Sequence, residues 1–295
     1  MTMVYSWVHS FTVYRSLECR PDSYRDWYHQ GNILRERGDL DGALSSYEKA
    51  LEYYPDDYWA WYKRGMTLED LGRFEEAARS YANAAGTRPD NYWAWYERGC
   101  IYLEELQEYE RAIACFERAL TVNPRDYWAA YRLGEAYRLL GNPEKAIGAY
   151  DRALMARPRD YWAWYRRGDA FRARGNREES LFNYRNALDA KPRDYWAWYQ
   201  QGVILQELQR FPEAIACYGK ALETEPDDRH AWYNLAGCHA TLGNSREALD
   251  ALERAIDLAS DIYRESARNN PVFDGLRQEE RFIALLDGDS RSEAA

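Results

Sequence analysis

The side chains best suited to binding chemistry in this chain are Trp and Tyr residues that recur at a fixed spacing. The 295 residues include 12 Trp and 26 Tyr. The segment Asp-Tyr-Trp-Ala-Trp-Tyr occupies residues 57–62, and its core returns at steps of 34 or 35 residues, at Tyr92, Tyr127, Tyr161 and Tyr195. Aromatic faces bind other rings, proline-rich segments and cations. The spacing therefore places the same aromatic side chains at equivalent positions of each copy.

Charged triplets form a second regular feature. Two of them occur one period apart, Arg132-Glu135-Arg138 and Arg166-Asp169-Arg172. On a helix, three-residue spacing lets each acid meet both of its arginines. One interpretation is an exposed stripe that neutralises itself. The other is a pair of arginine forks, each with one partner to spare for a carboxylate or phosphate of a ligand.

Catalytic and metal-binding patterns are missing from the sequence. It contains no Gly-rich phosphate loop, no HExxH and no nucleophile elbow. The five Cys have no CxxC spacing, and their odd number indicates free thiols in a reducing compartment. His230 and Cys238 would lie two helical turns apart, which disfavours a metal site. We predict a protein that is not an enzyme and has no cofactor or metal.

Composition argues against a membrane-spanning or secreted protein and against polyanionic partners. The net charge is −10 and the mean hydropathy is −0.76. No segment reaches the roughly 20 apolar residues that a membrane-spanning helix requires, and residues 1–14 do not resemble a signal peptide. The acidic balance argues against nucleic acid and anionic membranes as partners. We expect a cytoplasmic protein.

The period divides into two helical segments and two turns. Counting from residues 24, 58, 92, 127, 161, 195 and 229 gives seven units, and we number positions within a unit from these residues. Apolar residues at spacings of three and four predict one helix before position 15 and another through positions 20, 24 and 27. Gly at position 15 in five units predicts a turn, and Pro at position 32 or 33 ends the unit. The third unit has one extra residue, which we expect in its middle turn near Gln107.

These residues resemble the tetratricopeptide repeat (TPR) pattern. In the second unit the pattern is carried by Trp61, Gly65, Leu68, Ala77, Tyr81, Ala84 and Pro89. The resemblance implies an all-α fold, a right-handed α-solenoid of seven antiparallel helix pairs over residues 24–259. Residues 260–295 are expected to form C-terminal capping helices with a frayed tail, similar to the ending of many bacterial TPR proteins. Residues 1–23 are expected to form an N-terminal arm or cap.

The resemblance also implies where a partner binds. TPR proteins generally line a concave groove with the face that holds positions 2, 5, 9 and 12. Trp at position 2 can instead pack sideways on a neighbouring unit, so its exposure stays open. Over the seven units, positions 2, 5, 6, 9, 12 and 13 carry seven basic and eight acidic residues, so the groove is close to neutral, which disfavours RNA. The expected partner-binding residues are Trp59, Tyr62, Trp93, Tyr96, Trp128, Tyr131, Arg132, Arg138, Trp162, Tyr165, Arg166, Arg172, Trp196 and Tyr199.

We therefore predict a non-catalytic scaffold for protein–protein interaction. The partner would be a protein or peptide segment that is proline-rich, aromatic or carboxylate-bearing. The alternative is a structural solenoid that forms homo-oligomers through its aromatic faces or its N-terminal arm. RNA binding ranks below both.

Overall fold

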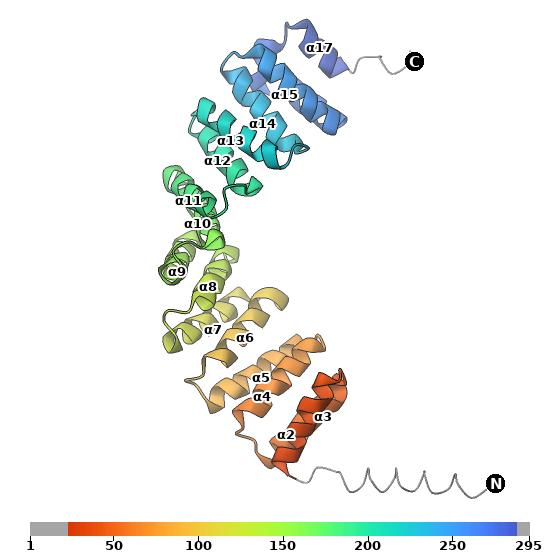
Figure 1. The fold of residues 1–295 in the computed structure, drawn as a ribbon, viewed down its shortest axis with the longest axis vertical. Helices are drawn as coiled ribbons and strands as arrows, with labels where there is room; N and C mark the ends of the chain where they lie inside the picture. Colours follow the sequence, from red (N-terminus) through yellow and green to blue (C-terminus); the bar gives the residue numbers. More distant parts are fainter. Residues whose placement is uncertain (1–22, 288–295) are drawn as a thin grey trace, which may run out of the picture. The chain divides into compact units, whose positions relative to one another are not determined.

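The computed structural model describes residues 23–287, which form two compact units divided between Gly141 and Asn142 (Figure 1). The arm or cap expected within residues 1–23 lies outside the described residues, except for Ser23, and so does the tail from residue 288. The described residues form helices and turns and contain no strand. The all-α prediction is therefore confirmed.

The first unit contains three complete helix pairs and one further helix. Its elements are α2 (Tyr24–Glu36), α3 (Leu40–Tyr53), α4 (Tyr58–Asp70), α5 (Phe74–Thr87), α6 (Tyr92–Cys100), η1 (Ile101–Glu105), α7 (Tyr109–Val122) and α8 (Tyr127–Leu139). Each helix packs against the next along the chain, so successive pairs stack side by side (Figure 1).

The second unit repeats the arrangement and adds a C-terminal cap. Its elements are α9 (Pro143–Ala156), α10 (Tyr161–Ala173), α11 (Arg177–Ala190), α12 (Tyr195–Glu207), α13 (Phe211–Thr224), α14 (Arg229–Thr241), α15 (Ser245–Leu258), α16 (Ser260–Asn269), η2 (Pro271–Leu276) and α17 (Glu280–Asp287). Phe273 and Phe282 of the cap are buried against the last pair. The cap thereby covers apolar surface that the last repeat would otherwise expose.

Local chemistry sets the helix boundaries. The Asp57 carboxylate accepts the backbone N–H of Ala60 at 2.6 Å and so caps α4. The helix ends before Gly72, whose φ of +71° is in the left-handed region that glycine adopts without steric strain. Gln107 and Gln209 take the same left-handed role in the third and sixth repeats, with φ of 55° and 60°.

The extra residue of the third repeat is accommodated differently from the prediction. Residues Ile101–Glu105 form a π-helical turn, in which the N–H of Leu106 bonds the carbonyl of Ile101 at 3.0 Å. The π-turn absorbs one residue inside the first helix. The middle turn itself keeps its usual form around Gln107, so the insertion lies before this turn and not within it.

The core of each pair requires close approach of a glycine and an aromatic ring. A Cβ on Gly65 would lie 2.9 Å from the Tyr81 ring, which is fully buried. Gly168 and Tyr184 have the same relationship in the second unit. Because glycine lacks a Cβ, the second helix can place its ring directly against the first helix.

Candidate functional site: the aromatic surface of the first helices

The Trp residues at position 4 have a structural role. The indole Nε1 of Trp61 donates to the carbonyl of Pro55 at 2.7 Å, and Trp164 donates to Pro158 at 2.9 Å. The same bond, six residues apart, recurs at Trp95, Trp198 and Trp232. These five indoles hold the loop before their own helix against the start of that helix, whereas the fourth repeat has Ala130 at position 4.

The Tyr residues at position 1 connect neighbouring repeats, which the sequence analysis did not predict. Tyr92 donates to Oδ1 of Asp126 at 2.7 Å, and Asp126 also accepts the N–H of Ala129 as the N-cap of α8. Tyr161 and Asp194 form the same bond at 2.6 Å in the second unit. Burial and the adjacent carboxylate both raise the pKa of Tyr92 far above its ordinary value. A tyrosine about one period before a cap residue is the sequence signal for this link.

The Trp residues at position 2 are exposed to solvent. Trp59, Trp93 and Trp128 in the first unit are 43–52% exposed, and Trp162 and Trp196 in the second are 49% and 58% exposed. Each packs edge-on against the preceding Tyr, with ring centroids 4.9–5.2 Å apart. About half of each indole therefore stays accessible to a partner, and the tyrosine holds its orientation.

The Tyr residues at position 5 are less accessible than the sequence analysis expected. Tyr62 stacks on Tyr58 at 5.7 Å and contacts the buried Tyr81, and its hydroxyl donates to Glu97 of the next repeat at 3.3 Å. Tyr96, Tyr131 and Tyr199 are partly buried, and Tyr165 is buried. Tyr199 accepts a bond from Asn234 of the next repeat at 3.1 Å. These rings mainly support the Trp residues and connect repeats.

The expected arginine anchors contact polar groups of this chain. Arg132 pairs with Glu104 of the preceding repeat at 2.5 Å, and Arg138 pairs with Glu135 at 2.9 Å. In the second unit Arg166 pairs with Asp169 at 3.2 Å, whereas Arg172 donates to Gln200 of the next repeat. The other oxygen of Asp169 accepts the Tyr184 hydroxyl at 2.7 Å. In each triplet one arginine pairs with the triplet's own acid, and the other contacts a neighbouring repeat.

Two glutamates of the first unit lie in an unfavourable electrostatic environment. Burial raises the pKa of Glu97, and the nearby charge of Glu69 raises it further. The pKa of Glu69 is also raised, chiefly by burial, although its carboxylate accepts the Tyr81 hydroxyl at 3.0 Å. This part of the first-helix face is therefore acidic and favours positively charged groups.

The part of the chain that the structure describes contains neither a candidate metal site nor a candidate membrane-spanning helix. Residues 23–287 contain no group of three or more His, Cys, Asp or Glu side chains placed to hold a metal ion. Among these residues, no helix combines the length and apolar character needed to cross a membrane.

The tetratricopeptide repeat family model matches residues 28–92, 62–105, 96–161 and 199–261, together more than half of the chain. A short match to the protein prenyltransferase alpha subunit repeat covers residues 177–208. A comparison with curated proteins gives no match.

Solved structures show the same architecture. MamA is 28% identical with a TM-score of 0.54, and the alignment covers 58% of this chain and 92% of MamA. YrrB, described as a TPR protein with an unusual peptide-binding site, is 22% identical with a TM-score of 0.58 over 65% of this chain and all of YrrB. The C-terminal part of a TPR repeat-containing protein from Cytophaga hutchinsonii is 16% identical with a TM-score of 0.66, over 85% of this chain and 99% of that one. Because the motif repeats, the helix pairs stack in order and the family model matches more than half of the chain, the chain belongs to the tetratricopeptide repeat family.

Proposed function

We propose that this protein is a non-catalytic scaffold that binds an extended or helical segment of a partner protein on its position-2 Trp residues. The observation that carries the proposal is the exposure of about half of each of these five indoles at equivalent sites. Exposed aromatic surface costs hydration free energy, and contiguous exposed apolar surface commonly marks interaction sites. Trp59, Trp93 and Trp128 would serve the first unit, and Trp162 and Trp196 the second.

The second unit contains an internal example of the contact that a partner would make. The Lys191 ammonium lies 5.1 Å from the centroid of Trp162 and 4.3 Å from that of Tyr161. One repeat later, the residue at the position of Lys191 is Glu225, which lines a pocket of about 510 Å³ with Trp196 and Asp227. A Lys or Arg side chain of the partner would occupy at Trp196 the place that Lys191 takes at Trp162.

This arrangement refines the expected chemistry of the partner. The arginines that could anchor a carboxylate contact acceptors of this chain, whereas Trp196 is bordered by carboxylates. Opposite charge at an interface favours encounter and correct register. We therefore favour a partner segment with a basic residue next to aromatic or proline residues.

Selection from a displayed library of random 12-residue peptides, followed by calorimetric titration, tests the proposal. Selected peptides are expected to be enriched in Lys or Arg together with aromatic residues or proline. Because aromatic anchors commonly contribute about 2 kcal/mol or more, Trp196→Ala is expected to weaken binding by about tenfold or more. Met155→Ala removes another exposed apolar side chain, on α9, and serves as the matched control.

Self-assembly through the same indoles is the competing function. Sedimentation of the wild type and of a Trp59→Ala, Trp93→Ala, Trp128→Ala variant separates the two. A wild-type dimer that the variant loses would favour self-assembly. Peptides that bind the wild type, Trp196→Ala and the triple variant equally well would contradict the proposed site.

A further inference from the structure

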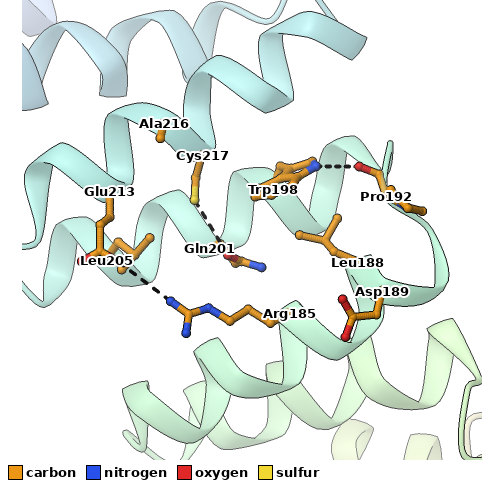
Figure 2. Close-up of a pocket in the computed structure, with 10 residues that line it drawn as sticks. All are labelled: Arg185, Leu188, Asp189, Pro192, Trp198, Gln201, Leu205, Glu213, Ala216 and Cys217. Atoms are coloured by element: carbon orange, nitrogen blue, oxygen red, sulfur yellow. Dashed lines mark hydrogen bonds and ion pairs between the residues drawn. The ribbon is translucent and has the colours of Figure 1, made fainter.

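A pocket of about 730 Å³ lies between α11 and α13 (Figure 2), and the residues that line it include no position-2 Trp. Helix α12 contributes Trp198, Gln201 and Leu205 to its lining, α11 contributes Leu188, and α13 contributes Cys217. Residues two apart on a helix point about 200° apart. Trp196 and Trp198 therefore face different surfaces, and this pocket is separate from the site proposed above.

Gln201 supplies an unsatisfied donor in this pocket. Its side chain is only 3% exposed, and its amide Nε2 has no hydrogen-bond partner among the described residues. Its Oε1 accepts a weak bond from the Cys217 thiol at 3.8 Å. A buried amide donor without an acceptor is costly, so native structures nearly always satisfy such groups. The donor indicates that a group bringing an oxygen acceptor belongs in the pocket.

Two other repeats fill the same place with an arginine of their own. In the second repeat Arg64 occupies position 7, where it pairs with Glu48 at 2.8 Å and donates to Ser80 at 2.6 Å. In the fifth repeat Arg167 pairs with Asp151 at 2.6 Å and donates to Asn183. The guanidinium thereby closes the space between successive second helices.

The sixth repeat lacks both halves of this ion pair. Gln201 stands at position 7 in place of arginine, and Arg185 stands where Glu48 and Asp151 stand in the other repeats. Arg185 reaches only to 3.9 Å from Glu213, a carboxylate that Arg210 already holds at 2.7 Å. The shorter, neutral Gln201 side chain cannot bridge the two second helices, which leaves a pocket whose walls are largely apolar.

We propose that this pocket binds an uncharged group with an aromatic or branched aliphatic body and a carbonyl oxygen. The carbonyl accepts from Gln201 Nε2, while the body packs against Trp198, Leu188 and Leu205. The volume is within the range of pockets that hold small ligands. A charged head is disfavoured, because Arg185, Asp189 and Glu213 in the lining carry charges of both signs and the apolar walls would not replace its lost hydration.

Acetophenone and ethylbenzene form a matched pair of probes, because they differ mainly in the carbonyl oxygen. Titration of the full chain is followed by NMR through the Gln201 side-chain amide and the Trp198 indole. Acetophenone is expected to shift both signals and to bind about three- to tenfold more tightly than ethylbenzene, as one added hydrogen bond allows. Equal affinities, or no shift at Gln201, would overturn the proposal.

Two variants that copy the chemistry of other repeats test the site itself. Gln201→Arg combined with Arg185→Asp restores the pairing of Arg64 and Arg167, and it should abolish binding of both probes. Gln201→Leu copies the residue at position 7 of the fourth repeat, and it should reduce acetophenone to the affinity of ethylbenzene. Circular dichroism establishes that both variants are folded. Unchanged acetophenone affinity in the folded double variant would refute the site.

N-acetyl-phenylalaninamide, which carries the same chemistry in a peptide context, identifies the source of the ligand. Binding of this amide as tightly as acetophenone would identify the occupant as a side chain and backbone carbonyl of a protein segment. Binding of acetophenone alone would identify a free small molecule. Failure of both probes to bind would overturn the proposal, with no effect on the Trp surface proposed above.

Discussion

Tyr92 of the third repeat and Asp126, the N-cap of the fourth, are joined by a hydrogen bond of 2.7 Å. The same carboxylate oxygen accepts the backbone N–H of Ala129. The start of one repeat's first helix therefore depends on a side chain of the repeat before it. Tyr58 and Asn91 form the corresponding link one repeat earlier, at 2.8 Å.

Tyr92→Phe is expected to lower the free energy of unfolding by about 1–2 kcal/mol, because it removes one bond to a carboxylate but leaves the helix cap. Asp126→Ala is expected to cost more, since it removes the cap as well. Urea denaturation followed by circular dichroism measures both. Equal stability of Tyr92→Phe and the wild type would show that the link contributes nothing.

Stability is expected to fall steeply above about pH 10. Burial raises the pKa values of Tyr47 and Tyr58 to about 12, against about 10 for tyrosine in the unfolded chain. The unfolded chain therefore loses these protons first, and folding stability decreases as the pH rises from about 10 towards about 12. Urea midpoints measured across this alkaline range test the expectation, and Tyr58→Phe should show a shallower decline than the wild type.

Glu97→Gln is expected to stabilise the protein at neutral pH. The raised pKa of Glu97 means that the folded state binds its proton more tightly than the unfolded chain does. The stability that this proton provides is present below the unfolded pKa and is lost as the pH rises through the folded pKa. Glutamine keeps an acceptor for Tyr62 without the charge. Glu104→Gln is the control in urea denaturation, because it breaks the ion pair with Arg132 and should give no gain.

Gln209→Gly is expected to raise the free energy of unfolding by about 1 kcal/mol, because a residue with a Cβ is strained at positive φ. The reverse change, Gly243→Gln, should lower it by a similar amount at the equivalent turn, where φ is 74°. Thermal denaturation measures both. Destabilisation by Gln209→Gly would indicate that the glutamine side chain makes a contribution of its own.

The fold was largely predictable because its signals lie within one repeat. Cap residues such as Asp57 and turn residues such as Gly72 determine where the helices begin and end, and both are recognisable from their neighbours. The π-turn after Cys100 was not predictable. The sequence reveals one extra residue, but packing of the first helix decides that this helix absorbs it, while Gln107 keeps the usual turn.

The candidate site was harder to predict because its contacts cross between repeats. The sequence singles out the Trp residues at position 2, but their exposure depends on packing against the preceding Tyr. Tyr62 was expected to face a partner, and its hydroxyl instead contacts Glu97, 35 residues later. Spacing alone favours a pair between Arg132 and the nearest acid, whereas Arg132 contacts Glu104 of the previous repeat. Periodicity predicts which face of a helix a side chain lies on, but it does not predict which side chain of the next repeat it contacts.

The tyrosine-to-cap link is replaced at the seventh repeat. The seventh repeat has Arg229 instead of Tyr at position 1, and the loop after α15 has no Pro before α16 begins. In its place, Tyr263 bonds His230 at 2.7 Å and Asn270 bonds Tyr233 at 3.1 Å, which joins the last pair to the cap. An eighth repeat appended here would find no donor for its first helix. The seventh repeat thus exchanges the link to a following repeat for contacts with the cap.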